Sequence, residues 1–185
     1  MGGQGRVGSL VRDSGAVRRP GAAIDDRLLG RESPPLGGGR KRGEKNQAIG
    51  RSRGGRTTKI HALTDAAGRP RVLLLSPGNV NDGTMAVALV ATAGPLRHLM
   101  ADRAYDAGAF RAWLAERGTE AVIPSTRSRK VAIPHDPDLY RQRNRIERMF
   151  CRLKDFRRVA TRYDKLARNY AAAVHLAAIP AFWLN

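Results

Sequence analysis

Four side chains that could take part in phosphate chemistry share one predicted helix. The segment from Asp138 to about residue 162 contains no Pro or Gly, and Asp138 is a favourable N-cap residue. At about 100° per residue, one stripe of this helix, about 60° wide, carries Tyr140, Arg143, Glu147 and Lys154. A carboxylate can bind a metal ion, Arg and Lys donate charge-assisted hydrogen bonds to phosphate oxygens, and Tyr can hydrogen-bond or stack.

The same stripe has a simpler interpretation. An apolar face adjoins it and a basic face lies beyond: Leu139, Ile146, Phe150 and Leu153 form the first, and Arg141, Arg145, Arg148 and Arg152 form the second. Glu147 could therefore be a surface carboxylate that neighbouring arginines neutralise. Helical spacing alone leaves both interpretations of Glu147 open.

The spacing of the four stripe residues resembles the Y-R-E-K signature of insertion-sequence transposases of the DDE type. Two residues separate Tyr140 from Arg143, three separate Arg143 from Glu147, and six separate Glu147 from Lys154. Further words resemble the same family: GRSRGGRTTKIHAL at 50–63, SPGNVNDG at 76–83, MADRAYDA at 100–107, AVIPS at 121–125 and YRQRNRIERMFCRLKDFRRVATRYDKLARNY at 140–170. The resemblance extends from about Gly38 to Leu184 and indicates the C-terminal, catalytic part of such a transposase.

The resemblance implies a ribonuclease H-like catalytic domain, in which strands and a late helix bring three carboxylates together. In this sequence Asp102, within MADRAYD, is then the second catalytic carboxylate and Glu147 the third, and both bind metal. Two magnesium ions held by such carboxylates activate the attacking oxygen and stabilise the leaving oxygen. Asp102 also ends an apolar run, and ligand sites in open α/β sheets gather at the carboxyl ends of strands. For the other acidic residues nearby we expect simpler roles, Asp106 as a helix N-cap and Asp82 as a turn or cap residue.

DNA contacts are expected from two parts of the chain. By resemblance, Tyr140, Arg143 and Lys154 contact DNA near the scissile phosphate. The run GGGRKRGEKNQAIGRSRGG at 37–55 is basic and glycine-rich, which is typical of a flexible linker but also suits contact with the phosphate backbone. Within this run and just after it, the expected DNA-binding side chains are those of Arg51, Arg53 and Lys59.

The first catalytic carboxylate of the family has no match in this sequence. It belongs to a D-S-T or D-S-S word on a strand upstream of the glycine-rich run, where Asp25 and Asp26 are followed by RLLGRESPP, which does not resemble the expected continuation. Codons can be chosen for Ala23–Pro34 that yield Ile-Asp-Ser-Ser-Val-Val after a shift of one base. We therefore expect residues 1–36 to be read out of frame, by programmed frame change or by decay, and the first strand to be missing.

The remaining segments are expected to form the elements that position these side chains. Residues 1–58 follow neither a helical nor a strand period, so we expect a disordered basic tail rich in Gly and Arg. From Lys59 the alternating KIHALTD and the apolar RVLLLS predict a hairpin. The elements predicted after it are, in order, a helix over 83–93, a strand ending at Asp102, a helix over 107–118, a strand in EAVIP, the helix after Asp138 and a last helix over about 165–184. Residues 59–185 should thus form a partial α/β domain, a mixed sheet flanked by helices.

Composition limits the class of partner. The chain has 34 Lys and Arg against 16 Asp and Glu, a formal net charge of +18, which favours a polyanion such as DNA. A solvated basic surface, or GC-rich DNA translated out of frame, is the alternative. The single Cys151 excludes an internal disulfide, the four His residues lack zinc-site spacing, and no segment resembles a secretory signal or a membrane span. These features favour a cytoplasmic protein without membrane contact.

Two functions remain open. The first is an enzyme, a transposase that uses Mg²⁺ to cleave and join DNA strands at the terminal repeats of an insertion sequence, in an oligomer with other transposase copies. The second is a catalytically inactive, DNA-binding transposase remnant, which the missing first carboxylate would explain. The small number of aromatic residues and the absence of an RNA-binding sheet motif argue against an RNA-binding module.

Overall fold

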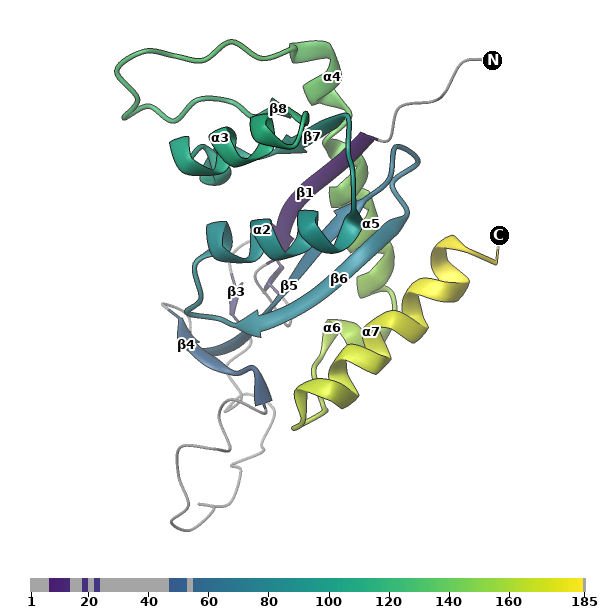
Figure 1. Ribbon diagram of the computed structural model, residues 1–185. Coiled ribbons are helices and arrows are strands. Elements are labelled where there is room, and N and C mark those ends of the chain that lie inside the picture. The colour runs from purple at the N-terminus through teal and green to yellow at the C-terminus, as the bar shows by residue number, and fades with distance from the viewer. Residues whose placement is uncertain (1–6, 14–17, 20–21, 24–46, 53–54, 185) are drawn as a thin grey trace. The chain divides into compact units, whose positions relative to one another are not determined.

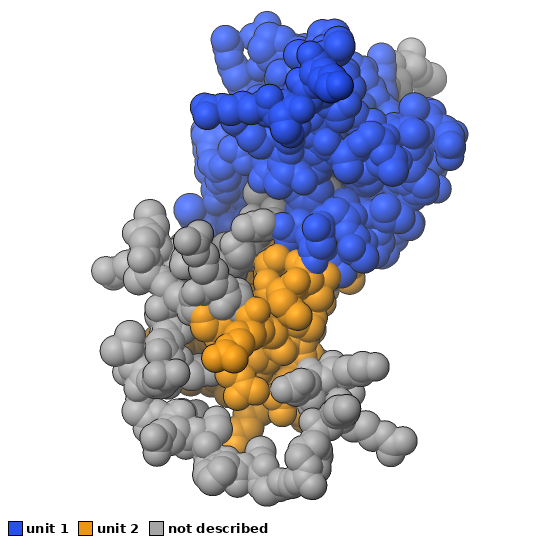
Figure 2. Space-filling model, turned by 90° about the vertical axis from the view of Figure 1, so that its left-hand side faces the viewer, with its two compact units in different colours: residues 1–12, 61–73, 81–151 blue, residues 13–60, 74–80, 152–185 orange. Residues whose placement is uncertain are grey.

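The computed structural model describes residues 7–13, 18–19, 22–23, 47–52 and 55–184 of the chain, and the side chains of 47–51 and 55–184. The chain divides into two compact units (Figure 2). The first unit contains residues 1–12, 61–73 and 81–151, and the second contains residues 13–60, 74–80 and 152–185. The residues that sequence analysis assigns to catalysis therefore belong to the first unit, since both Asp102 and Glu147 fall within 81–151.

Most of the described strands form one mixed sheet. In chain order they are β1 (Val7–Asp13), β4 (Gly50–Ser52), β5 (Gly55–Thr64), β6 (Pro70–Pro77), β7 (His98–Ala101) and β8 (Glu120–Val122). Their order across the sheet is β4-β5-β1-β7-β8, and β6 also pairs with β5. The β4–β5 pair is antiparallel, whereas β1–β7 and β7–β8 are parallel. Two short strands, β2 (Arg18–Arg19) and β3 (Ala22–Ala23), pair with each other.

Helices cover both faces of this sheet. The described helical segments are α2 (Asp82–Ala93), the 3₁₀ turn η2 (Arg103–Tyr105), α3 (Gly108–Glu116), α4 (Pro137–Arg141), α5 (Asn144–Lys154), α6 (Arg157–Ala160) and α7 (Ala167–Phe182). In Figure 1, α2 crosses in front of the strands and α5 lies behind them. The mixed α/β class predicted from the sequence is confirmed. Among the described helices, none has the length and apolar character needed to cross a membrane.

Strand β5, which the alternating KIHALTD predicts as one strand of a hairpin, is buried on both faces. Every residue of β5 from Thr58 to Thr64 is buried, and His61 and Thr64 are completely inaccessible. A strand with helices over both faces buries all of its side chains, whatever their polarity. The hairpin itself is confirmed, because β5 and β6 pair across a turn in which Asp65 Oδ1 accepts hydrogen bonds from the N–H groups of Ala67 and Arg69.

The single long helix predicted after Asp138 is wrong. The short helices α4, α5 and α6 occupy this segment. The N-cap of α4 is Asp136, whose carboxylate accepts hydrogen bonds from the N–H groups of Asp138 and Leu139. Between α4 and α5, hydrogen bonds to the carbonyl three residues earlier come from the N–H groups of Gln142, Arg143, Arg145 and Ile146. Such bonds wind the chain by about 120° per residue, so the positions expected on one continuous α-helix do not hold across this junction.

Strands also occur in the N-terminal part of the chain. β1 lies between β5 and β7, and Val7–Leu10 pairs with His98–Ala101 in register. β4 and the start of β5 fall inside the predicted tail of residues 1–58, so the predicted boundary after residue 58 lies within β5. Residues 24–46 lie outside the described residues. An out-of-frame origin for 1–36, and the absence of the strand that carries the first carboxylate in the family, stay predictions.

Helix α5 packs through one apolar side and is tied at its start to the β5–β6 turn. Its buried residues are Ile146, Met149, Phe150 and Leu153. The guanidinium of Arg145 donates to the carbonyl of Ala66 in the turn. Gly68, in the same turn, has a φ of +81°, and a Cβ there would lie 3.2 Å from the Cβ of Arg145. Both the positive φ and the close approach therefore favour glycine at this position.

Replacing Ile146 by Ala should lower the free energy of unfolding by about 2–5 kcal/mol, because it removes a fully buried side chain and leaves a cavity under α5. Arg148→Ala, on the exposed side of the same helix, should change it by less than about 0.5 kcal/mol. Urea denaturation followed by circular dichroism measures both values. Equal effects would show that α5 does not pack through the side described.

Candidate active site

Asp102 directly follows β7 and caps the 3₁₀ turn η2. Its Oδ1 accepts a hydrogen bond from the N–H of Ala104 at 2.9 Å, and its carbonyl accepts one from the N–H of Tyr105 at 3.0 Å. The strand before it is buried from Leu99 to Ala101, and Tyr105 after it is buried as well. The half-exposed Asp102 carboxylate is thus held by its own main chain at the carboxyl end of a parallel strand.

Glu147 lies in the first turn of α5 and forms an ion pair with Arg143. Arg143 Nη2 is 2.6 Å from Glu147 Oε1, and the Glu147 side chain is 50% exposed. The Arg143 guanidinium also lies over the ring of Tyr140, 5.7 Å from its centroid, and this ring contacts His135 edge-on with centroids 5.4 Å apart. The structure therefore brings three of the four signature residues together, and it adds His135, which the sequence did not single out.

The other predicted DNA contacts are more dispersed. Lys154 is the half-buried last residue of α5, seven positions and thus about two turns after Glu147. Arg51 is exposed in β4, and Arg53 lies outside the described residues. Lys59 is buried, and its Nζ donates to the carbonyl of Val80 at 2.7 Å, which argues against direct contact between Lys59 and a phosphate.

The donor set fits part of a divalent-metal site. Asp102 and Glu147 lie in the same unit, and carboxylate oxygens are the hard ligands that Mg²⁺ and similar ions prefer. Within the described ranges, no three His, Cys, Asp or Glu side chains form a group that could hold a metal ion.

Asp106 does not have the N-cap role that the sequence predicts, because the N-cap of α3 is Ala107. The Asp106 side chain is completely buried, and each of its carboxylate oxygens accepts two hydrogen bonds. Oδ1 accepts from Arg111 Nε at 2.7 Å and from Arg129 Nη2 at 2.9 Å. Oδ2 accepts from the N–H of Thr126 at 2.7 Å and from Arg129 Nε at 3.0 Å. The predicted cap is wrong because the carboxylate turns into the protein, toward these donors.

The surroundings of Asp106 keep its carboxylate ionised. Burial by itself would raise the pKa of this carboxyl group. The hydrogen bonds from Arg129, from the Thr126 main chain and from Arg111, with the positive charge of Arg111, outweigh that effect and hold the pKa well below its ordinary value. The buried group is thus a permanent anion at neutral pH, with two arginines as its partners.

The segment SPGNVNDG, residues 76–83, packs closely on the β4–β5 hairpin, and its last two residues begin α2. A Cβ at Gly78 would lie only 2.0 Å from Thr57 Oγ1, and the Gly78 N–H donates to the carbonyl of Thr57 at 2.9 Å. Asn81 is the N-cap of α2 and accepts from the N–H of Gly83 at 2.8 Å, whereas Asp82 lies in the first turn and is buried. This part of the sequence therefore has a packing role.

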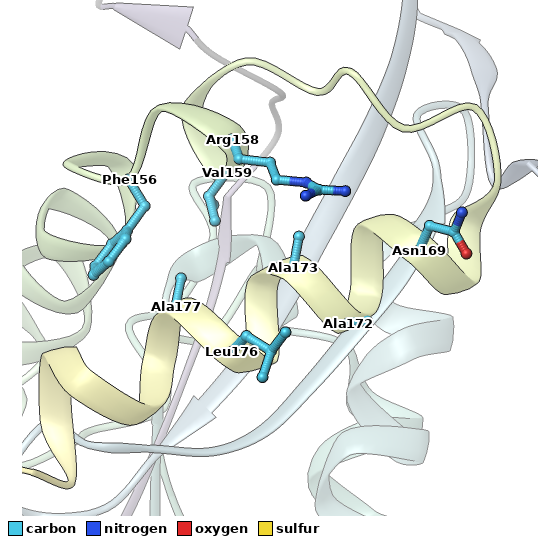
Figure 3. Close-up of a pocket in the computed structure, with 8 residues that line it drawn as sticks. All are labelled: Phe156, Arg158, Val159, Asn169, Ala172, Ala173, Leu176 and Ala177. Carbon is cyan, nitrogen blue, oxygen red and sulfur yellow. The ribbon is translucent and has the colours of Figure 1, made fainter.

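An open hollow of about 450 Å³ lies in the second unit, between the α6 region and α7 (Figure 3). Apolar side chains dominate its lining, among them Phe156, Val159, Leu176 and Ala177. Arg158 and Asn169 are its polar members. The lining contains no carboxylate and no signature residue, so this hollow is not the candidate active site.

The fold and the site agree with one class of protein. A mixed α/β layer with one acidic side chain directly after a parallel strand and another at the start of a late helix is consistent with a ribonuclease H-like domain of the DDE type. The sequence matches the family of transposase DDE domains over residues 17–179, and the chain belongs to that family.

Two transposases illustrate the similarity. One, named as a transposase for insertion sequence element IS6501 of Brucella ovis, is 37% identical over 132 residues, which cover 70% of this chain and 99% of the relative. The other, named as a transposase for insertion sequence element IS402 of Burkholderia cepacia, is 32% identical over 137 residues, which cover 68% of this chain and 63% of the relative. Membership links this chain to DNA transposition, and the family generally acts on DNA with divalent metal ions.

The family match also bears on the N-terminal segment. It begins at residue 17, upstream of Gly38, where the resemblance found in the sequence begins. It therefore includes residues 17–36, most of the segment predicted to be out of frame. Sequencing of the gene tests that prediction directly.

Asp106→Asn should lower the free energy of unfolding at pH 7 by about 3–5 kcal/mol, because it removes the charge from a buried ion group and leaves two arginines without their anion. The folded-state pKa of Asp106 is lowered, so its contribution is present above the unfolded pKa of about 4 and is lost as the pH falls below it. The variant should therefore lose less stability than the parent chain on acidification. Urea titrations between pH 7 and pH 2 measure this.

The matched control is Asp138→Asn, which removes an acidic residue from a pair with Arg141 in which both side chains are about 80% exposed. It should change stability by less than about 0.5 kcal/mol and leave the acid profile as it was. An Asp106→Asn profile parallel to that of the parent chain would show that this carboxyl group does not titrate below its ordinary range.

Proposed function

We propose that this chain carries two of the three carboxylates of a metal-dependent DNA transposase that cleaves and joins phosphodiester bonds at insertion-sequence ends. The observation that carries the proposal is the placement of Asp102 directly after β7 together with Glu147, paired with Arg143, at the start of α5. Both carboxylates then serve as metal ligands. Family membership supports the reaction class, and the full signature spacing supports the residue roles.

Magnesium is the proposed metal ion, because carboxylate oxygens suit a hard cation and its other sites stay available to water and phosphate. When bound in pairs, such ions activate the attacking oxygen and stabilise the leaving oxygen of an in-line displacement. Asp102 is prepared for this role by the main-chain hydrogen bond that orients Oδ1. Glu147 is half-exposed, so its carboxylate is accessible from solvent.

Arg143 positions both Glu147 and the DNA in this proposal. It donates to Glu147 through Nη2, and its five N–H groups leave donors for a phosphate oxygen. The guanidinium also makes a cation–π contact with the Tyr140 ring, 5.7 Å from its centroid. Lys154 adds a cation farther along the same helix, and Arg51 adds one from β4. These side chains are the proposed DNA contacts at the terminal repeats, and other transposase copies are the proposed partners in an oligomer.

The chain should nick DNA only when the missing first carboxylate is supplied. In a nicking assay with Mg²⁺ and supercoiled DNA that carries the insertion-sequence ends, a version whose upstream frame is restored over codons 23–35 should be active. The unrestored chain should give only background cleavage, because a site with two of three carboxylates holds its metal ions poorly. Chelation of the metal, or Glu147→Ala in the restored version, should reduce cleavage to the same background.

The control for Glu147→Ala is Glu116→Ala, an exposed acidic residue at the end of α3. It should retain the activity of the restored version. Cleavage by the unrestored chain that Glu147→Ala abolishes would contradict the expected need for a restored frame. If Asp13→Asn abolished that cleavage too, the first carboxylate would be assigned to Asp13, the last residue of β1.

A further inference from the structure

The loop between β8 and α4, residues 123–136, is fixed at several points despite its lack of secondary structure. The Ile123 carbonyl accepts from Arg111 Nη2 at 2.6 Å. Farther on, Ser125 Oγ accepts from the N–H of Ile133 at 2.8 Å, which closes the loop at its base. Between these two residues the N–H of Arg129 donates to the carbonyl of Thr126 in a tight turn. The loop is therefore closed at its base by a hydrogen bond, and a tight turn shapes its tip.

Asp106 holds the inner side of this loop. Three of the four hydrogen bonds to its carboxylate come from loop residues, one from the N–H of Thr126 and two from the guanidinium of Arg129. Arg129 also donates to the Asp106 carbonyl at 3.3 Å. The fourth bond comes from Arg111 of α3, which itself contacts the start of the loop. A buried anion thus joins the loop to the segment that follows Asp102.

The tip of the loop presents cations to solvent. Arg127 and Lys130 are exposed, and Val131 beside them is 77% exposed. The segment from Pro124 to His135 contains no acidic residue. Neither Arg127 nor Lys130 forms an ion pair with any residue that the structure describes. Exposed cations that have no ion-pair partner among the described residues are suited to an external polyanion.

The sheet directs this loop to the edge that carries Asp102. β7 and β8 run in parallel, and Met100 pairs with Val122. Asp102 lies two residues beyond Met100, and Pro124 lies two residues beyond Val122. Because parallel strands end at the same edge, the loop and the catalytic candidate leave the sheet on adjacent strands.

We propose that the loop tip, Arg127 with Lys130, binds the DNA phosphate backbone beside Asp102, and that Asp106 is the positioning residue that holds the tip for this contact. The inference deepens the proposed function and rests on it for the choice of DNA as the polyanion. It assigns no chemical step to Asp106. It gives the basic segment STRSRK (residues 125–130) a role separate from that of the Y-R-E-K signature residues in α4, in α5 and between them.

The first test measures DNA binding without metal or cleavage. Fluorescence anisotropy with a fluorescein-labelled duplex of arbitrary sequence, in buffer with EDTA, measures Kd at salt concentrations from about 50 to 200 mM. Loss of two phosphate contacts should reduce the magnitude of the slope of log Kd against log salt by about 1.8 in Arg127→Ala/Lys130→Ala. The control, Arg97→Ala/Arg117→Ala, removes the same charge from exposed residues that precede β7 and β8, at the opposite edge of the sheet. Its slope should change by less than about 0.5. Equal slope changes in the two double variants would overturn the proposal.

The second test asks whether Asp106 acts through the tip. Asp106→Asn, and Arg129→Ala as a milder variant, retain Arg127 and Lys130 but should show the same reduced slope, measured well below their melting temperatures. Trypsin should also cleave the loop faster in the two folded variants than in the folded parent chain. A role in stability alone would lower the melting temperature and leave the slope unchanged, and that result would refute the positioning role. The binding measurements contain no metal. A negative nicking assay together with the expected reductions in slope would therefore count against the proposed function alone.

Discussion

The fully buried carboxylate of Asp106 is the interaction on which the sheet edge that carries Asp102 depends. Its four hydrogen bonds reach α3 and the loop after β8, so the segments that follow β7 and β8 share one anchor. Removing one partner from such a group costs about 3–5 kcal/mol, whereas replacing the whole group with apolar side chains is often neutral. The value of this buried charge is therefore geometric, since an apolar cluster could supply similar stability without orienting two arginines and a main-chain N–H.

The anchor also divides the large positive charge of the chain into two kinds. A single buried anion neutralises part of the charge of Arg111 and Arg129 and turns both inward. Arg127 and Lys130, which lie two positions before and one position after Arg129, face solvent. A count of 34 basic residues treats all of these alike, but some of them maintain the fold and others are exposed to solvent. The salt dependence of binding reports only the second kind.

The parts of the fold that could be predicted are those whose signals are local. Apolar runs bounded on at least one side by Gly or Pro located the β5–β6 hairpin, α2, β7, α3 and β8, because turn residues mark element ends directly. The break between α4 and α5 was missed because neither Gly nor Pro marks it, and the i→i−3 hydrogen bonds there depend on packing. Asp106 was misassigned for a similar reason. A carboxylate just before a helix looks like a cap, whereas its true partners, Thr126 and Arg129, are 20 and 23 positions away.

The candidate site was predicted in part, and the structure sharpens the choice between the two interpretations of Glu147. Glu147 is neutralised by Arg143, as the simpler interpretation expects. A half-exposed pair four residues apart on a helical segment contributes only about 0.3–0.5 kcal/mol, so a metal ion or a phosphate can displace it at little cost. The pair with Arg143 therefore competes only weakly with a metal-binding role. It holds the carboxylate and the guanidinium side by side, where one can bind a cation and the other the phosphate that the cation accompanies.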